Sequence, residues 1–460
     1  MAVLKLSLGE RARSVSIHYH YAWFIAVLAA VLQVTTNFVG QAFAILMPII
    51  QKEFGWSLTA ITLAYFFRSI IQAVLSPTAG WVAERYGARR SLLLAATLYV
   101  GGMLLLSSIN EVWQLYICYS LILGVAQALF TVNIPTTVAA WFKKRLGIAV
   151  GLQQSLGGMG ASVMAPILAL VLGRVDWQIA FLVITAIGGT IIFGLLFLFR
   201  SDPADRGMKP YGSTEDDPPP VANGNPEVTM LRTRVFLQHV RRTRAFWNLM
   251  AIHHLGCVGH AVIMVSAVHF ATTKGVSLEA AALIVSLYSF CSIGSRFITP
   301  VLADRWGAKG VMALFFFIQG VTVALLFWTH EAWQFYLFSV LFGIGLGGEM
   351  SAFLVINRQY YGMGPVRTVF GFQHLGSGLG MALGGLMGSV IFDYLGSYDL
   401  AWVISIAASL SGVVCIFLLE PTSRILIPHW EDSLPPEARS PSKATNSQQS
   451  AIIVEARPER

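Results

Sequence analysis

Long apolar stretches separated by short polar loops make up most of the chain. A helix needs about 20 apolar residues to cross the hydrocarbon core of a bilayer. Two polar segments break the pattern, the Pro-rich stretch 200–243 and the tail 421–460. The remainder predicts twelve transmembrane helices, at roughly 22–46, 57–80, 91–109, 112–140, 146–172, 177–199, 245–271, 279–301, 310–328, 332–357, 368–391 and 399–419.

These limits divide the chain into two halves of six helices each. We expect a first bundle over 22–199 and a second over 244–420, with 200–243 as a linker between them. Residues 1–21 form an N-terminal tail, and the first helix is too long for the apolar part of a signal peptide. The polar composition of the linker and of the tail 421–460 predicts disorder.

Composition supports a polytopic membrane protein. Of the 460 residues, 55% are apolar and 12% charged, and the mean hydropathy is +0.65. Soluble domains carry about 25% charged residues. The four cysteines all fall inside predicted helices, which is typical of small buried side chains and not of a disulfide framework or a metal site.

The basic residues indicate the orientation. If the N-terminus is cytoplasmic, 26 of the 31 Lys and Arg residues lie on the cytoplasmic side and three lie in outer loops. This bias predicts that both termini are cytoplasmic. We therefore expect a multi-pass protein of the plasma (cell inner) membrane. The net charge of +8 is spread along one membrane face, so it does not indicate nucleic-acid binding.

The two halves repeat one another at a fixed offset. The loop "GWVAERYGARR" at 80–90 returns as "PVLADRWGAKG" at 300–310, and further identities continue at the same offset of 220 residues for about 75 residues. Parallel repeats of six helices form a pair of bundles related by an axis along the membrane normal. A site between such bundles can open alternately to each side of the membrane. The repeat therefore predicts transport.

The repeated loop resembles the motif G-x-x-x-D-R-x-G-x-[RK]-[RK] of the major facilitator superfamily. The resemblance covers all twelve predicted helices. It implies an all-α membrane fold of twelve transmembrane helices in two pseudo-symmetric six-helix bundles. It also implies that the loops act as a conformational latch, whose acids can accept hydrogen bonds from arginines or from a helix N-terminus of the other bundle. The latch residues are Gly80, Glu84, Arg85, Gly87 and Arg89 in the first copy, and Asp304, Arg305 and Gly307 in the second.

Two further segments resemble one branch of that superfamily. "WFKKRLGIAVGLQQSLGGMG" at 141–160 is similar to the fifth helix of monocarboxylate transporters, and "FGFQHLGSGLGMALGG" at 370–385 is similar to the eleventh helix of their bacterial relatives. In this branch and in the oxalate–formate exchangers, an arginine eight residues before the second acidic loop residue binds substrate. The resemblance implies that role for Arg296.

Three ionisable residues lie well inside predicted helices, where a charge is costly unless it faces a cavity or a partner. Arg296 either binds an anionic substrate or pairs with Glu349. Arg68 either binds substrate, forms a gating ion pair or extends its charge toward the outer surface. Glu349 either pairs with an arginine or carries a coupling proton, and His254 is a second candidate for coupling.

Polar and aromatic side chains in other predicted helices are further candidates for substrate contact. Amides and histidines inside a bundle either face substrate or bridge helices. Tyrosines on the faces of Arg68 and Arg296 either stack on an organic substrate or line a packed interface. These candidates are Asn37, Gln41, Asn133, Gln154, His374, Tyr65 and Tyr288.

We therefore expect a secondary active transporter of a small organic anion, a mono- or dicarboxylate, that works by alternating access. The chain has no P-loop, so proton symport or exchange supplies the energy. Two alternatives are an exporter of an amphiphilic or aromatic compound and a sensor that binds without transport. Neither HExxH nor GxSxG occurs, so we expect no enzyme. We also expect no cofactor, no metal and no nucleic-acid partner, and a monomer in the lipid bilayer.

Overall fold

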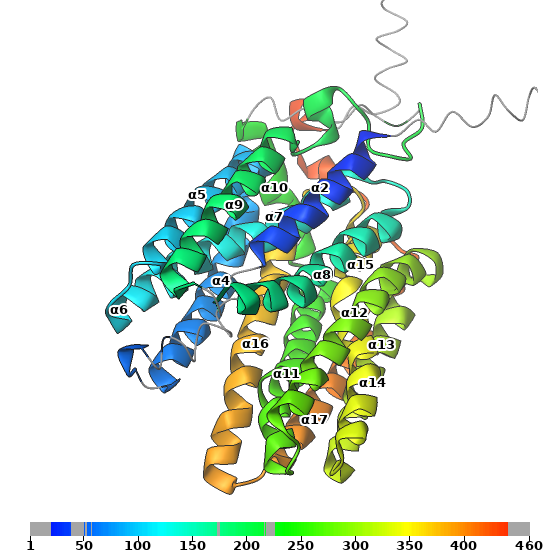
Figure 1. Ribbon diagram of the computed structural model, residues 1–460. Helices are drawn as coiled ribbons and strands as arrows, with labels where there is room; N and C mark the ends of the chain where they lie inside the picture. Colours follow the sequence, from blue (N-terminus) through cyan, green and yellow to red (C-terminus); the bar gives the residue numbers. More distant parts are fainter. Residues whose placement is uncertain are drawn as a thin grey trace, which may run out of the picture.

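The computed structural model describes residues 20–37, 50, 53–56, 58–172, 175–215, 217 and 226–439. Over this part the chain is almost wholly helical (Figure 1). Its long helices form two groups, and the helical segments of the linker and the tail lie at one end of the molecule (Figure 1).

The first bundle contains the helices of the N-terminal half. The fourth predicted helix is continuous over Val112–Trp141 but changes winding, since α6 (Val112–Leu115) passes into the π-helix η1 (Tyr116–Ile122) and then into α7 (Leu123–Trp141). The other members are α2 (Tyr21–Thr36), α4 (Leu58–Tyr86), α5 (Ala88–Leu106), α8 (Leu146–Leu172) and α9 (Trp177–Leu198).

The second bundle follows the same order. The tenth predicted helix is divided at Ala352 into α14 (Ala332–Ser351) and α15 (Phe353–Tyr361). The ninth ends in a 3-10 turn, α13 (Ala308–Val323) followed by η3 (Ala324–Trp328). The others are α11 (Arg244–Thr273), α12 (Leu278–Trp306), α16 (Arg367–Leu395) and α17 (Asp399–Phe417).

The helix count agrees with the expected twelve. Within the described ranges, nine helical segments are long and apolar enough to cross a membrane. The shorter apolar α2, together with α4 and α8, accounts for the remaining three predicted helices. The expected all-α fold of two six-helix bundles is confirmed.

Local geometry repeats between the halves. Gly87 and Gly307 both have φ of +89°, a value that side chains strongly disfavour, and each precedes the helix after its loop. Glu111 and Glu331 each form a capping box, with Gln114 and Gln334 respectively. The residues that repeat in the sequence therefore form the same turns and the same helix N-termini in both halves.

The bundles meet where α4 packs against α16 and α8 packs against α12. Glycine allows these helices to approach closely. A Cβ at Gly147 would lie 2.1 Å from the carbonyl oxygen of Pro300, and a Cβ at Gly371 would lie 2.4 Å from that of Ser76. The two crossings correspond under the 220-residue offset. The contact of Gly147 with Pro300 has its counterpart in that of Arg367 with Gly80, and the contact of Gly371 has its counterpart in that of Gly151 with Phe297.

The expected disorder of the linker and tail is wrong for residues 200–215, 226–243 and 421–439. The linker contains η2 (Pro203–Arg206) and α10 (Pro226–Val240), and the tail contains η4 (Trp430–Ser433) and η5 (Pro436–Ala438). Trp430 packs on Phe236 of α10, with ring centroids 5.0 Å apart. Composition alone missed this contact because a few spaced apolar residues are sufficient to bury one face of a short helix.

Candidate functional site

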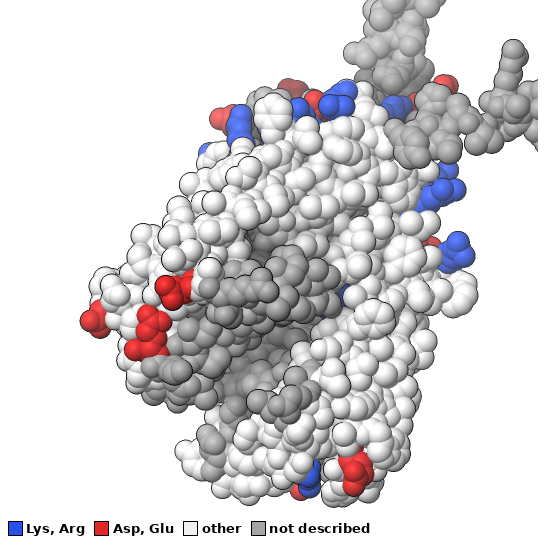
Figure 2. Space-filling model, viewed as in Figure 1, with Lys and Arg blue, Asp and Glu red and all other residues white. Residues whose placement is uncertain are grey.

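A cavity of about 300 Å³ lies between the two bundles. Figure 2 shows the surface hollowed between them, while Lys and Arg gather toward the end that carries α10. Side chains from both bundles line the cavity, from α2, α4, α7 and α8 on one side and from α11, α12, α14 and α16 on the other. The cavity is therefore placed where movement of one bundle against the other would change its access.

Arg68 reaches the cavity from α4 in the first bundle. Only 8% of the residue is exposed, and its Nε makes no hydrogen bond to any described residue. Its guanidinium carbon lies 5.4 Å from the ring centroids of both Tyr65 and Tyr119. The two tyrosines hold the cation by cation–π attraction and by side-chain hydrogen bonds, while the buried Nε is left for a ligand.

Arg296 reaches the cavity from α12 in the second bundle. Its side chain crosses to the first bundle, since a Cβ at Gly158 of α8 would lie 3.4 Å from its Cδ. Its Nε is buried without a hydrogen-bond partner among the described residues. The expected alternative of a close ion pair with Glu349 is not seen, because no described carboxylate lies within 4.0 Å of this guanidinium.

The described lining of the cavity contains two guanidinium groups and no Asp or Glu. Two arginines from different bundles line the cavity, and no acid in the described lining compensates their charge, so the cavity carries a positive potential. A planar guanidinium can bind a carboxylate through two parallel hydrogen bonds. The arrangement is therefore suited to an anion.

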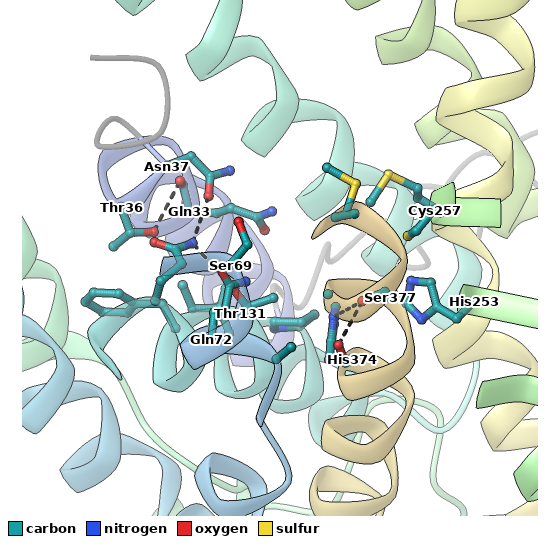
Figure 3. A pocket seen from close by; sticks show the side chains of 18 of the residues that line it. Gln33, Thr36, Asn37, Ser69, Gln72, Thr131, His253, Cys257, His374 and Ser377 are labelled. Atoms are coloured by element: carbon teal, nitrogen blue, oxygen red, sulfur yellow. Dashed lines mark hydrogen bonds between the residues drawn. The ribbon is translucent and has the colours of Figure 1, made fainter. Parts of the chain in front are cut away.

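Uncharged polar groups line the cavity on the side of the first bundle (Figure 3). Gln127 donates to Asn37 at 3.5 Å and to Thr131 at 3.3 Å, and Gln72 donates to Thr131 at 3.3 Å. Gln154 also lines the cavity. These amides and hydroxyls can orient a polar ligand without adding charge.

Two histidines line the side of the second bundle (Figure 3). The ring of His253 stacks on Phe353 at 4.0 Å and lies 5.4 Å from the ring of His374. His374 contacts Ser377 at 3.3 Å through Nδ1. Their stacking and hydrogen bonds fix the shape of this wall.

The structure brings most, but not all, of the candidate residues to the cavity. Asn37, Tyr65, Arg68, Gln154, Arg296 and His374 line it, whereas Gln41 lies outside the described residues. Three others lie elsewhere. Asn133 donates to Ser91 of α5 at 2.8 Å, Tyr288 packs on Phe342, and His254 contacts the carbonyl of Gly376 at 3.1 Å. These three bridge or pack helices, the alternative that the sequence left open.

Several residues that line the cavity were not among the candidates from the sequence. Their spacing from a candidate on the same helix could have identified them. Gln33 lies four residues before Asn37, and Gln72 lies four residues after Arg68, so each shares a helix face with a candidate. A search for polar residues one helical turn before or after each candidate would have identified both. His260, and not His254, is the histidine of α11 that lies beside Glu349, with its Nδ1 3.3 Å from Oε2.

The two acids of the repeated loops each contact a helix N-terminus in the opposite bundle. Glu84 accepts a hydrogen bond from the backbone N–H of Arg367, the first residue of α16, at 3.0 Å. Asp304 accepts one from the backbone N–H of Gly147, near the start of α8, at 3.4 Å. Both are the contacts that the loop motif implied, and both lie on the end that carries the linker and tail.

The remaining loop residues support these contacts. A Cβ at Gly80 would lie 2.5 Å from the carbonyl of Arg367, so only glycine permits this approach. Arg89 donates from Nε to the carbonyl of Leu196 at 3.0 Å, which ties the loop to the end of α9. Arg85 lies over Trp81 and Tyr86, and Arg305 is exposed.

The side chain of Arg367, which was not among the candidates from the sequence, strengthens the contact between Glu84 and the start of α16. Its side chain lies 3.8 Å from Glu84 and 3.2 Å from Asp202. Beside it, a second cavity of about 320 Å³ at the same end is lined partly by Lys143 and Asp217. The hydrogen bond from Lys143, at 2.5 Å, lowers the pKa of Asp217 to about 2, so this carboxylate stays charged.

Comparison with known proteins identifies relatives of this chain. The model of the Major Facilitator Superfamily matches residues 26–271 and 249–453. The oxalate:formate antiporter of Oxalobacter formigenes is 22% identical over 405 residues, which cover 87% of this chain and 92% of that protein. Monocarboxylate transporter 11 of Homo sapiens is 23% identical over 409 residues, covering 85% and 81% respectively.

A solved structure gives the same fold. The proton:xylose symporter XylE, bound to 6-bromo-6-deoxy-D-glucose, superposes with a TM-score of 0.66 at 15% identity. The match covers 87% of this chain and 96% of that one.

Proposed function

The chain belongs to the Major Facilitator Superfamily and is a multi-pass membrane transporter, and on that premise we propose that it moves a small organic anion by alternating access. The observation that carries the proposal is the pair of arginines in one cavity. Arg68 and Arg296 come from different bundles, and the described lining has no acid to neutralise them.

The geometry links binding to movement. An anion that contacts both guanidinium groups would draw the two bundles together around it. Release then requires the bundles to part on one side, which breaks the contacts of Glu84 and Asp304 with the opposite helices. These contacts close one end of the molecule while the cavity lies between the bundles, which fits one half of an alternating-access cycle.

We propose that the closed end is cytoplasmic. The bias of Lys and Arg toward that end supports the assignment, since cytoplasmic loops carry most basic residues. The plasma membrane is the proposed location. On this assignment the structure is an outward-facing state, with Glu84 and Asp304 as its latch.

The proposed substrate is a mono- or dicarboxylate. The names of the two relatives, an oxalate:formate antiporter and a monocarboxylate transporter, support that class. Apolar lining residues, including Phe130, Phe370 and Met350, can contact the carbon atoms of such an acid. The two guanidinium groups favour an acid with two anionic or polar ends over one with a single carboxylate.

A thermal-shift panel tests the substrate class. Purified protein is mixed with formate, acetate, lactate, oxalate or succinate, and its melting temperature is compared with that of the unliganded protein. At least one acid should stabilise the protein, because a ligand that binds only the folded state raises stability. Arg296→Ala should weaken that acid's binding by about 30-fold or more, as for loss of one partner of a buried charge pair.

The matched control is Arg241→Ala, which removes an exposed arginine away from the cavity. It should bind the acid as the wild type does. Equal binding by Arg296→Ala and the wild type would reject Arg296 as the anion anchor. Stabilisation by a neutral aromatic compound, with no response to any acid, would favour the exporter alternative.

A further inference from the structure

Three residues with metal-binding side chains meet inside the second bundle. Cys257 and His260 belong to α11, and Glu349 belongs to α14. Their ligand atoms, a sulfur, a ring nitrogen and a carboxylate oxygen, all lie within 4.8 Å of one another. Each of the three residues is at most 1% exposed. The cluster is therefore enclosed by protein and is not part of a charged surface.

The local sequence of α11 brings two of these side chains together. Cys257 and His260 belong to the stretch "CVGH" and are three residues apart, so they share one face of the helix. Gly256, the residue before Cys257, leaves room for the third side chain, because a Cβ there would lie only 2.1 Å from Oε1 of Glu349. One short segment of α11 therefore supplies two possible ligands and the space for a third.

The buried polar atoms of the cluster lack ordinary partners. Among the described residues, no hydrogen bond is made to either oxygen of Glu349 or to Nδ1 of His260. This Nδ1 lies 3.3 Å from Oε2 of Glu349 without the alignment of a hydrogen bond. A buried carboxylate without a partner is very costly. An ion pair with a protonated His260 would leave the thiol of Cys257 unused, whereas a metal ion would engage all three side chains.

The types of donor and their spacing suit zinc. Zn²⁺ binds thiolate, imidazole and carboxylate at about 2.0–2.3 Å, so two atoms bound to one ion lie roughly 3.3–3.7 Å apart. Nδ1 of His260 and Oε2 of Glu349 already have this spacing. Nε2 of His260 lies 3.1 Å from the sulfur of Met381, so it can donate its hydrogen there while Nδ1 binds the ion.

The charges of such a site would balance. Zn²⁺ with the thiolate of Cys257, the carboxylate of Glu349 and the neutral imidazole of His260 sums to zero, which avoids a net charge inside the helices. The thiol releases its proton to water when the ion binds. Arg296 interacts with Glu349 electrostatically from beyond 4 Å, and a neutral site does not repel it. Cys257 also lines the cavity, which gives the ion a route of entry.

We propose that Cys257, His260 and Glu349 form a binding site for one zinc ion, which joins α11 to α14 behind the cavity wall. Three protein ligands leave a fourth position for water or another small ligand. Zinc should stabilise the folded protein, because the unfolded chain does not hold the three ligands together. The zinc site is separate from the anion-binding arginines, so it stands whether or not the protein transports an acid.

Metal analysis of the purified protein tests the site. The full chain is purified through a tag without histidine, stripped with a chelator, supplied with Zn²⁺ and desalted, and its zinc is measured by inductively coupled plasma mass spectrometry. The wild type should hold about one zinc ion per chain. Its melting temperature should rise when Zn²⁺ is added to the stripped protein and fall again with the chelator.

Cys257→Ser removes the thiolate and nearly preserves the size of the side chain. Loss of an outer-shell partner of a ligand already costs about 10–100-fold in metal affinity, so loss of a ligand should weaken zinc binding by about 100-fold or more. Added Zn²⁺ should then leave the melting temperature of this variant unchanged. Without zinc it should melt as the stripped wild type does, which separates loss of the metal from loss of the fold.

Cys118→Ser is the matched control, because Cys118 is also a buried cysteine, 7% exposed, and lies in the first bundle. It should hold zinc as the wild type does. Co²⁺ in place of Zn²⁺ identifies the ligand directly, since a cysteine bound to cobalt gives a thiolate-to-metal charge-transfer absorption. This absorption should appear in the wild type and in Cys118→Ser, and it should be absent from Cys257→Ser.

Three results would overturn the zinc site. The first is equal zinc content and equal stabilisation in Cys257→Ser and the wild type. The second is a stripped wild type that neither retains zinc nor is stabilised by it. The third is a charge-transfer absorption that disappears in Cys118→Ser and persists in Cys257→Ser. Anion binding is tested separately, by the thermal-shift panel and Arg296→Ala, so failure of either proposal can be recognised on its own.

Discussion

At the residue scale, the main features of the molecule are three charged groups buried inside its helices. Arg68 and Arg296 lie in predicted helices, where an uncompensated charge is expensive, and both reach the same cavity. Glu349 lies apart from them, against Gly256 and His260. The second bundle therefore keeps the guanidinium group of Arg296, which lines the cavity, apart from the buried carboxyl group of Glu349.

Gly256→Ala tests whether the carboxyl group of Glu349 is held where the structure places it. The new Cβ would lie 2.1 Å from Oε1 of Glu349 and 2.8 Å from the ring of Phe316. Crowding of this kind typically costs about 1–3 kcal/mol. We expect a lower melting temperature for the purified variant than for the wild type.

Gly294→Ala is the control for that substitution. Gly294 also lies in a helix of the second bundle, but a Cβ there would meet nothing within 4 Å. Its melting temperature should equal or exceed that of the wild type, since alanine favours helix. Equal melting temperatures for the two variants would show that Glu349 is not packed against Gly256.

At the element scale, two helix crossings hold the bundles together at the closed end. α8 meets α12 at Gly147, and α16 meets α4 at Gly371. Glu84 and Asp304 add hydrogen bonds to the N-termini of α16 and α8. Because the two crossings are related by the sequence repeat, they should contribute similarly to closure.

Gly147→Ala and Gly371→Ala should therefore both favour opening at this end. Each new Cβ would lie within 2.4 Å of a backbone oxygen in the other bundle, so the helices must separate. A cost of about 1–3 kcal/mol shifts a two-state equilibrium by about 5-fold to about 150-fold. The measurement is maleimide labelling of a reporter cysteine at Ala140, which lines the cavity at this end, in a background without the native cysteines.

Gly101→Ala and Gly310→Ala are suitable controls, because a Cβ at either position meets nothing within 4 Å. They should leave the labelling rate unchanged. Equal labelling in all four variants would mean that the glycine crossings do not govern closure.

The linker and tail form a small element of their own at that end. Trp430 packs on Phe236 of α10 and beneath the guanidinium of Arg232, which pairs with Glu431 at 2.5 Å. Trp430→Ala should weaken this contact by about 3 kcal/mol, the lower range for loss of a buried tryptophan. We expect faster hydrogen exchange in α10, measured by mass spectrometry, with transport unchanged.

Trp328→Ala provides the comparison, since Trp328 is 70% exposed. It should leave exchange in α10 as in the wild type. Protection of α10 that persists in Trp430→Ala would indicate that the tail does not hold this helix.

At the scale of the whole molecule, the sequence predicted the architecture because hydrophobic length and internal repetition determine it. Twelve apolar stretches and a 220-residue offset are sufficient to define two related bundles. The loop acids could also be placed, because a helix N-terminus attracts an acid wherever the repeat brings one near. Both the architecture and the position of the loop acids follow from hydrophobic length and the sequence repeat, and neither requires knowledge of individual side-chain contacts.

The cavity was harder to predict because its lining depends on how each helix is rotated. Asn133 and Asn37 are both amides in predicted helices, yet only Asn37 faces the cavity while Asn133 bridges to Ser91. Nor does a sequence show that His260, and not His254, contacts Glu349, since a rotation of α11 exchanges the faces they occupy. The linker helix α10 was missed because its apolar face depends on a tail about 200 residues away in the sequence.

The measurement that tests the central claim most directly is counterflow of a radiolabelled acid from the panel into proteoliposomes. The wild type and Arg241→Ala should take up the acid, whereas Arg296→Ala and Arg68→Ala should fall to the level of protein-free vesicles. Full uptake by either cavity variant would contradict the account of an anion held between two arginines. A wild type that binds an acid but never takes it up would identify a sensor and contradict transport itself.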